Sequence, residues 1–292
     1  MNITIVGPGA IGSLWAIKLL QAGHNVALWS RCTDHAIDLS LDGQASFSFS
    51  NNKIEKLSES DLVIFTVKAW QVEEATTPLL QYLDSDTILM FMHNGMGAVA
   101  QIATHIDAHP VVLATTTQAA FKPDKNNVSH TGFGQTQLGA FNLKGQQCTF
   151  LVDVLEHALP SVNWNTEIKT ALWTKLAINC AINPLTGLEQ IKNGELADQR
   201  FNDILSSIVK ELTQVMLAEG ITCSFDELET SVNKVIQATA KNNSSMKQDM
   251  FYQRKTEIDF ITGHLIKTAL KHQIEVPVNQ KLFTQVKERE NS

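Results

Sequence analysis

The chain is poor in cysteine, and the few that it has are far apart. Its 292 residues contain four cysteines, with no CxxC pair and no histidine at ligand spacing: Cys32, Cys148, Cys180 and Cys223. Scattered thiols of this kind argue against a disulfide framework and against a structural zinc site. We therefore expect reduced cysteines that pack in the interior, no metal centre and a cytoplasmic protein.

Basic clusters and long apolar runs are also missing. The net charge is −7 and no run of lysine or arginine occurs, so the sequence shows no electrostatic footprint for nucleic acid or an anionic membrane. No apolar segment reaches membrane-spanning length, and the apolar start from Ile3 to Val6 is too short for a signal peptide. With 43% hydrophobic and 18% charged residues, a globular protein is expected, and 292 residues suit two domains. The sequence leaves open whether the protein is a monomer or a homodimer.

Short apolar runs alternate with helical segments over about the first 160 residues. The runs lie at 2–6, 25–29, 61–67, 87–92 and 111–114. Continuous runs of this length are typical of parallel strands that are covered on both faces, and the alternation with helices predicts a Rossmann-type doubly wound sheet. The stretch 121–150 is richer in Asn, Gly and Gln, and we expect short strands and turns there.

The pattern changes to long helices after about residue 165. Helical periodicity covers 168–183, 198–219, 225–243 and 246–272, without a convincing strand pattern. The fold class expected is therefore α/β. The sheet domain would occupy residues 1–165, and an all-helical C-terminal domain would occupy residues 166–292.

A glycine-rich turn follows the first predicted strand directly and precedes a helix. Its sequence is Gly7-Pro8-Gly9-Ala10-Ile11-Gly12. In this context Gly7 allows the tight turn, Gly9 lets the backbone approach a pyrophosphate, and Gly12 lets the helix pack closely on the strand. The N-terminus of the helix would then offer free N–H groups and a favourable dipole to the phosphates. The motif predicts a dinucleotide cofactor.

The end of the second predicted strand bears on which dinucleotide binds. NAD-binding sheets usually place an acid there to hold the ribose hydroxyls, but this chain has Ser30 and Arg31. An arginine and a hydroxyl would bind a 2′-phosphate that an acid would repel. Asp34, close by, weakens the argument, yet the residues favour NADP.

Three polar side chains interrupt an otherwise apolar helix. Lys175, Asn179 and Asn183 are spaced at i, i+4 and i+8, so they lie along one narrow stripe. The stripe could be the solvated face of the helix. It could also line a polar cleft in which one ammonium and two amides meet a small, oxygen-rich molecule.

Nearly the whole chain resembles the ketopantoate reductases (2-dehydropantoate 2-reductases). Besides the glycine-rich turn, the matching segments are Val67–Gln71 (VKAWQ), His93–Gly97 (HNGMG), Thr115–Thr117 with Ala119-Ala120, Leu172–Thr186, Asn193–Leu196, Asn243–Met246 and Thr256–Asp259. The glycine-rich turn is common to many dehydrogenases. The ordered combination of KAWQ, HNGMG and LWxKLAxNCxINPLT is highly specific for this family.

The resemblance implies the residues that would contact the cofactor. It adds Lys68, Gln71, Asn94, Ala120 and Glu257 to the glycine-rich turn from Gly7 to Gly12 and to Arg31, which the sequence pattern already indicates. Lys68 and Gln71 match positions at the phosphates and the adenosine end, and Ala120 matches a backbone contact. Glu257 matches a carboxylate near the nicotinamide ribose.

The resemblance also implies a catalytic centre. Lys175 matches the family's proton donor, with Glu257 nearby, since an ammonium both stabilises and protonates the oxygen of a ketone that accepts hydride. The positions matching substrate contacts are Asn94, Lys175, Asn179, Asn183, Asn193, Asn242 and Ser245. The implied activity is NADPH-dependent reduction of 2-dehydropantoate to (R)-pantoate, on the route to pantothenate and coenzyme A.

Two positions depart from the family pattern, and two other functions stay open. Gln118 replaces a frequent histidine and Ala114 a frequent glycine; neither is expected to carry chemistry. The alternatives are a reductase of another branched 2-oxo acid and a non-catalytic NADPH-binding sensor on the same fold. The intact set of polar residues argues against the sensor.

Overall fold

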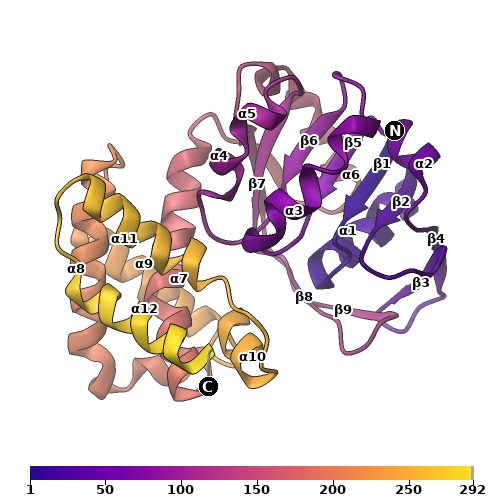
Figure 1. Cartoon of the computed structure of the whole chain (residues 1–292). Helices are drawn as coiled ribbons and strands as arrows, with labels where there is room; N and C mark the ends of the chain where they lie inside the picture. The colour runs from indigo at the N-terminus through magenta and orange to yellow at the C-terminus, as the bar shows by residue number, and fades with distance from the viewer. Residues whose placement is uncertain (291–292) are drawn as a thin grey trace. The chain divides into compact units, whose positions relative to one another are not determined.

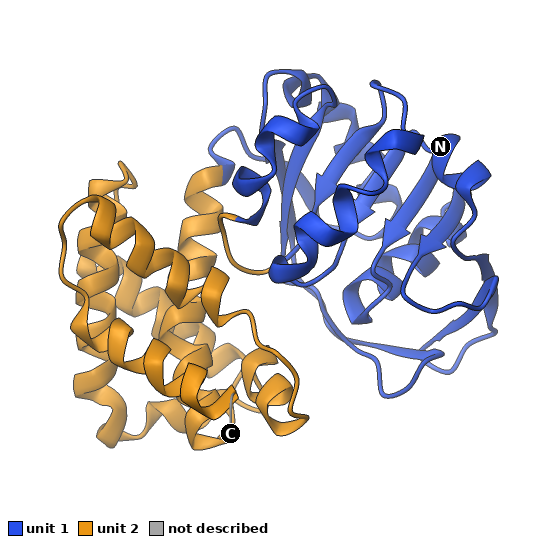
Figure 2. Cartoon of the chain, in the orientation of Figure 1, with its two compact units in different colours: residues 1–93, 98–168 blue, residues 94–97, 169–292 orange. Residues whose placement is uncertain are grey.

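The structure is a computed structural model that describes residues 1–290, and it divides into two compact units (Figures 1 and 2). Unit 1 comprises residues 1–93 and 98–168. Unit 2 comprises residues 94–97 and the chain from residue 169. The short segment 94–97 thus leaves the sheet unit and belongs with the helices that follow much later in the sequence.

Unit 1 is built on a seven-stranded sheet of order β11-β10-β7-β6-β5-β1-β2. Its strands are β1 (Asn2–Val6), β2 (Asn25–Trp29), β5 (Leu62–Phe65), β6 (Ile88–Phe91), β7 (Val111–Thr116), β10 (Thr136–Ala140) and β11 (Val162–Trp164). The first five are parallel, whereas β10 runs antiparallel to β7. The predicted strands are confirmed, and β5 and β6 are buried along their whole length, as parallel strands covered on both faces should be.

Helices fill the connections between these strands. Unit 1 contains α1 (Ala10–Gln21), α2 (Ile54–Ser58), α3 (Val72–Thr76), α4 (Ala98–Gln101), α5 (Ala103–Ile106), α6 (Leu151–Ala158) and short 3₁₀ turns at Ala69–Gln71, Leu80–Tyr82 and Lys144–Phe150. The core joins the sheet to α1 and α6 through apolar side chains such as Ile5, Trp15 and Leu155. Burial of these side chains from water provides most of the driving force for folding the unit.

A second, four-stranded sheet extends unit 1 beyond the parallel sheet. Its order is β4-β3-β9-β8, formed by β3 (Ala36–Leu41), β4 (Phe47–Ser50), β8 (Ala119–Phe121) and β9 (Asn127–Gly132). The short strands expected in 121–150 are therefore present, although β9 joins this smaller sheet rather than the main one. Strands β3 and β4 were not predicted from the sequence.

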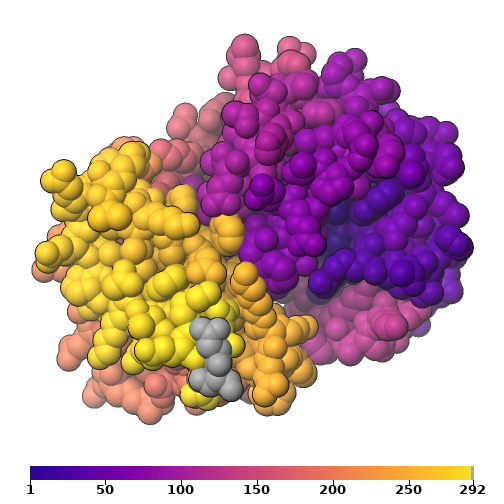
Figure 3. All heavy atoms as spheres, in the orientation of Figure 1, coloured from indigo at the N-terminus to yellow at the C-terminus, as the bar shows by residue number. Residues whose placement is uncertain are grey.

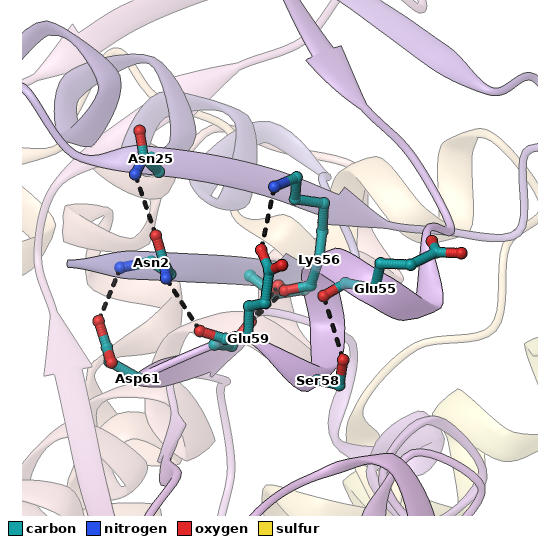
Figure 4. Close-up of polar contacts among 9 residues, drawn as sticks. Asn2, Asn25, Glu55, Lys56, Ser58, Glu59 and Asp61 are labelled. Carbon is teal, nitrogen blue, oxygen red and sulfur yellow. Dashed lines mark hydrogen bonds and ion pairs between the residues drawn. The ribbon is translucent and has the colours of Figure 1, made fainter.

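A polar network ties together the amino ends of β5, β1 and β2 (Figure 4). The Asn25 side chain donates to the Asn2 side chain at 3.0 Å, and the Asn2 backbone N–H donates to Asp61 Oδ2 at 2.8 Å. The Asn2 amide also donates to the Glu59 carbonyl, next to the ion pair of Lys56 with Glu59. These contacts fix the register of β1 against its neighbours at the edge opposite to the glycine-rich turn.

Unit 2 is helical in its described part. It contains α7 (Ile168–Glu189, whose first residue lies in unit 1), α8 (Asn202–Ala218), α9 (Phe225–Ala238), α10 (Ser245–Phe251), α11 (Thr262–Lys271), α12 (Pro277–Glu290) and 3₁₀ turns at Asn193–Ala197, Gln199–Phe201 and Ile258–Phe260. Apolar side chains of these helices form one core cluster, with Trp173, Leu212 and Leu265 among its buried members. No described helix is long and apolar enough to cross a membrane.

One helical prediction in unit 2 is wrong. A single helix was expected over 246–272, but the chain breaks after Phe251 and resumes as α11 at Thr262. The break begins with Gln253 at a φ of +53° and includes a turn in which the Thr256 hydroxyl accepts from the Ile258 N–H. A positive φ ends a helix, and a buried threonine hydroxyl competes for the backbone N–H.

Candidate active site

The glycine-rich turn has the shape of a dinucleotide loop. Gly7 has a φ of +81°, and a Cβ on Gly12 would lie 2.2 Å from the Thr66 hydroxyl, so the backbone and the packing require glycine at both positions. At Gly9, among the described atoms, the nearest neighbour of a Cβ would be the Gly7 carbonyl oxygen at 3.9 Å. Neither the local fold nor its packing therefore demands glycine at position 9. The space there suits the close approach of a phosphate group.

The N-terminus of α1 strengthens that fit. Gly9 is its N-cap, and no side chain of the described residues caps this helix end. The first N–H groups of the helix are thus available to an anion, and the helix dipole favours negative charge there. Because β5, β1 and β2 are neighbouring parallel strands, the segments that leave their carboxyl ends emerge at the same edge as this turn.

The segment after β2 places Arg31 at the surface. Asn51 and Asn52, which the sequence analysis missed, shape this segment: the Asn52 side chain accepts from the Ser30 N–H at 2.9 Å. The Ser30 hydroxyl donates to the Asn51 side chain at 3.1 Å and accepts from the Cys32 N–H. Arg31 itself is exposed. The loop therefore presents the arginine, while the serine hydroxyl takes part in the loop's own hydrogen bonds.

Lys68 and Gln71 follow the carboxyl end of β5. Both are partly buried, and the Gln71 side-chain oxygen accepts from the Lys68 N–H at 3.2 Å across a 3₁₀ turn. Their neighbour Thr66 donates its hydroxyl hydrogen to the Gly7 carbonyl at 2.7 Å. This hydrogen bond joins the segment that carries Lys68 and Gln71 directly to the glycine-rich turn.

Lys122, which was not predicted from the sequence, also contacts the glycine-rich turn. It follows β8, the strand that holds Ala120, and its ammonium donates to the Pro8 carbonyl and the Ser13 hydroxyl, each at 2.9 Å. Burial lowers the pKa of Lys122 below its ordinary value, partly opposed by Asp124. The sequence offers one indirect signal for this contact. A lysine lies two residues after Ala120, which was itself predicted to lie near the cofactor that the glycine-rich turn binds.

Gln118 has a structural role. Its buried side chain donates to the carbonyls of Gly134 and Pro160 at 2.8 and 2.9 Å and accepts from the Gly134 N–H. The His130 ring lies 2.8 Å from its side-chain oxygen. A buried amide with this many partners joins several loops of unit 1.

In unit 2, the polar stripe lies along α7. Lys175 and Asn179 are partly buried and Asn183 is buried, so the stripe is not a fully solvated helix face. Burial lowers the pKa of Lys175 from its ordinary value to about 8, while the Glu257 carboxylate attracts the ammonium and opposes that decrease. A lysine with this pKa can donate a proton near neutral pH.

The segment 94–97 places Asn94 beside Glu257. The Asn94 side-chain nitrogen lies 3.5 Å from Glu257 Oε2, a long hydrogen bond. The Met96 N–H donates to the Phe260 carbonyl at 2.8 Å, and Gly95 has a φ of +79° where a Cβ would lie 2.5 Å from the same carbonyl oxygen. Glycine at 95 therefore permits the close approach. Glu257 is only 4% exposed, whereas Asn94 and Lys175 are partly buried. We name these three residues the Lys175 centre.

The far end of α7 packs against the N-terminus of α10. The Thr186 and Ser244 hydroxyls are 2.7 Å apart, and a Cβ on Gly187 would lie 2.7 Å from the Met250 sulfur. These contacts bring the turn of α7 after Asn183 close to the start of the helix that begins with Ser245. Ser245 is exposed, as is Asn242, whereas its neighbour Ser244 caps α10 by accepting from the Lys247 N–H.

Asn193 is held within unit 2 by its own neighbours. Its side-chain nitrogen donates to the Thr239 hydroxyl at 2.9 Å, and its backbone N–H donates to the Asn242 carbonyl at 3.1 Å.

Among the described residues, no group of three or more His, Cys, Asp or Glu side chains could hold a metal ion.

Comparisons with known proteins all indicate the same family. The description "Ketopantoate reductase PanE/ApbA" matches residues 3–142, and "Ketopantoate reductase PanE/ApbA C terminal" matches residues 167–290. The chain is 53% identical over 292 residues to a 2-dehydropantoate 2-reductase of Vibrio cholerae, covering 100% of this chain and 99% of that one. It is 38% identical over 295 residues to the enzyme of the same name from Salmonella typhimurium, covering 100% and 96%.

Two solved structures share the fold over the full length. A ternary structure of D-mandelate dehydrogenase with NADH and anilino(oxo)acetate has a TM-score of 0.90 at 23% identity, covering 100% of this chain and 99% of that one. A PanE/ApbA family ketopantoate reductase from Ralstonia eutropha has a TM-score of 0.87 at 23% identity, with the same coverage. With matches along both units and a full-length relative at 53% identity, the chain belongs to the ketopantoate reductase family.

Proposed function

We propose that the protein reduces 2-dehydropantoate to (R)-pantoate with NADPH, with Lys175 as the proton donor. The observation that carries the proposal is the partly buried Lys175, whose pKa of about 8 suits proton donation, in a chain related over its full length to 2-dehydropantoate 2-reductases. In the balanced reaction, the C2 ketone gains a hydride on carbon and a proton on oxygen. NADPH supplies the hydride when bound and leaves as NADP⁺.

Lys175 and Glu257 are the residues proposed to manage the proton. The ammonium would donate a hydrogen bond to the ketone oxygen and stabilise the negative charge that develops there, before it transfers the proton. Glu257, buried in the same centre, raises the proton affinity of Lys175 and so keeps part of the lysine population charged at neutral pH. Asn94, at 3.5 Å from Glu257, can orient that carboxylate and offer its amide to a ligand.

Side chains along α7 and α10 are proposed to hold the substrate. 2-Dehydropantoate carries a carboxylate, a ketone and a hydroxyl, all of which accept hydrogen bonds from amide and hydroxyl donors. Asn179, Asn183 and Ser245 supply such donors, and the bond between Thr186 and Ser244 supports placing them near one another. Asn193 and Asn242 complete the proposed set, with Asn193 already anchored on Thr239.

NADPH is proposed as the cofactor rather than NADH. The family consists of pyridine-nucleotide oxidoreductases, and the glycine-rich turn with its uncapped helix fits a pyrophosphate. Lys68, Gln71 and Ala120 lie on segments that border the same turn and would hold the rest of the nucleotide. The exposed Arg31 guanidinium would pair with a 2′-phosphate, which NADH lacks.

A steady-state assay tests the proposal. We expect purified protein to oxidise NADPH rapidly with 2-dehydropantoate, more slowly with other branched 2-oxo acids, and poorly when NADH replaces NADPH. Faster turnover of another 2-oxo acid would make that acid the substrate. Tight NADPH binding without turnover of any 2-oxo acid would show that the protein is a sensor and that the proposed activity is wrong.

A further inference from the structure

Glu257 lies on a short irregular segment, not on a helix. The segment connects α10 to α11, and Thr256, Glu257 and Ile258 are 1%, 4% and 0% exposed. A buried carboxylate keeps a useful position only if its backbone is fixed, because the side chain has few conformations available to it in a packed interior. The contacts that hold the segment therefore bear directly on the geometry of the Lys175 centre.

The last turn of α12 holds this segment on both sides of Glu257. Glu290 accepts from the Thr256 N–H at 2.7 Å, and the Lys287 ammonium bonds to Asp259 Oδ2 at 3.0 Å. Lys287 and Glu290 also form an ion pair with each other at 3.1 Å. Helix α12 lies on the face of unit 2 that Figure 3 shows in yellow. Lys287 and Glu290 are about one helical turn apart on this helix. We name Lys287 and Glu290 the C-terminal clamp.

The contacts of the clamp stabilise the charged forms of both Lys287 and Glu290. Burial alone would raise the pKa of Glu290, but its hydrogen bonds with Thr256 and the Lys287 ammonium hold the pKa below its ordinary value. The pKa of Lys287 is raised, because its bonds to Asp259 and Glu290 outweigh the opposing effect of burial. Both groups are therefore charged at neutral pH, and their hydrogen bonds are the stronger, charge-assisted kind.

We infer that Lys287 and Glu290 are positioning residues that keep the Glu257 carboxylate beside Lys175 and so keep the proton donor charged during turnover. The inference rests on the proposed function, because the charge on Lys175 matters for turnover only if Lys175 donates the proton. Loss of the clamp would let the 256–259 segment shift, and the attraction that Lys175 receives from Glu257 would weaken with distance. Less of the lysine would then carry a proton at a given pH.

Other charged or titratable groups also lie near the segment, and substitution of Lys287 or Glu290 leaves them unchanged. The Arg254–Asp249 pair, with 3.6 Å between Nε and Oδ1, lies at the preceding break, and His264 on α11 faces Gly97 and the Trp173 ring. Burial lowers the pKa of His264, so this ring is neutral where Lys175 titrates. The Glu257 carboxylate raises the pKa of Lys175 against the opposing effect of burial.

The experiment compares clamp variants with conservative and surface controls. Glu290→Ala and Lys287→Met remove the contacts, whereas Glu290→Gln keeps an acceptor for the Thr256 N–H and Lys287→Arg keeps a cation for Asp259. Lys281→Met, on the exposed side of the same helix, and Glu275→Gln, just before it, serve as surface controls. Two quantities are measured for each protein: the pKa of Lys175 by NMR of the lysine side chains, with Lys175→Arg for assignment, and kcat as a function of pH.

We expect Glu290→Ala and Lys287→Met to lower the pKa of Lys175 by about half a unit or more. At pH 8 a fall of half a unit should lower kcat by about twofold and a fall of one unit by about fivefold, whereas the conservative and surface variants should stay near the unmutated values. An unchanged Lys175 pKa in a folded Glu290→Ala protein would overturn the clamp, whatever the activity. A shifted pKa in a protein that never reduces 2-dehydropantoate would instead support the clamp and overturn the proposed function. A purely structural role would lower thermal stability but leave both the pKa and the pH profile in place.

Discussion

The glycine-rich turn and the Lys175 centre are built in opposite ways. The turn is made of backbone from six consecutive residues, and its chemistry is the N–H groups at the end of one helix. The Lys175 centre is made of side chains from segments far apart in the sequence, with Asn94, Lys175 and Glu257 on three separate elements. A loop of the first kind requires particular backbone shapes, whereas a centre of the second kind requires an entire packed unit to bring its groups together.

This difference predicts different responses to mutation. Removal of a side chain should leave the turn's N–H groups in place, so the turn should be sensitive mainly to added bulk. The Lys175 centre should respond to loss of a charged group, because a buried charge that loses its partner is costly and a lost proton donor cannot be replaced by the backbone. Substitutions in both units test this contrast.

Lys175→Met should cause the largest change. The substitution keeps much of the side chain's length but removes the proposed proton donor, so kcat should fall by about 10² to 10⁴. NADPH affinity should stay close to that of the unmutated protein, since the proposed phosphate contacts lie in unit 1. Lys210→Met, on the exposed face of α8, is the matched control and should leave kcat unchanged. Turnover near the normal rate in Lys175→Met would show that the proton comes from another group.

Arg31→Ala tests the side chain proposed to select NADPH over NADH. A charge-assisted contact to phosphate is worth about 1.5–3 kcal/mol, so NADPH affinity should fall by about tenfold to a hundredfold. NADH affinity, which involves no 2′-phosphate, should hardly change and serves as the internal control. Both can be measured by titrating the fluorescence of the reduced nucleotide. Equal losses for the two nucleotides would place Arg31 elsewhere on the cofactor.

Two glycine substitutions separate folding from cofactor binding within the turn. Gly12→Ala places a Cβ 2.2 Å from the Thr66 hydroxyl and 2.8 Å from a backbone oxygen, so the free energy of unfolding should fall by about 1–3 kcal/mol. Gly9→Ala has room for its Cβ and should keep the stability of the unmutated protein, yet it should bind NADPH at least about tenfold more weakly. Denaturation curves and NADPH titrations of both variants make the comparison. Normal NADPH binding by Gly9→Ala would exclude the proposed approach of the phosphates.

The smallest effect should come from a charged cluster in unit 2 away from the Lys175 centre. Hydrogen bonds from Lys271 and His272, and a weaker one from Lys169, lower the pKa of Glu219 from its ordinary value of 4.5 to about 2. Because the folded protein has the lower pKa, this stabilisation is complete above about pH 4.5 and disappears as the pH falls towards 2.

Glu219→Gln should therefore reduce the free energy of unfolding by about 1 kcal/mol at pH 7, a value discounted because the lysine partners are exposed to solvent. At low pH the difference from the unmutated protein should vanish. Glu189→Gln, at an exposed position at the end of α7, is the control. A stability difference that persists at low pH would point to lost packing rather than lost charge.

The sequence predicted most of unit 1 because its signals are local. The apolar runs of β5 and β6, and the glycine-rich turn between β1 and α1, follow from a few adjacent residues. Lys122 escaped prediction because its contact with Pro8 joins residues 114 positions apart and has no local pattern. The break after Phe251 escaped prediction because the apolar residues on either side of it keep helical spacing, while the packing of Thr256 against Glu290 is a long-range property.

The most direct test of the account is the pH dependence of kcat/KM for 2-dehydropantoate with saturating NADPH. As the proposed proton donor, Lys175 must be protonated to act, and its pKa is about 8. The value of kcat/KM should therefore be constant below that pH and fall about tenfold for each further pH unit above it. A profile that stays flat well above pH 8, in a protein that remains folded and saturated with NADPH, would contradict the assignment of Lys175 as the proton donor.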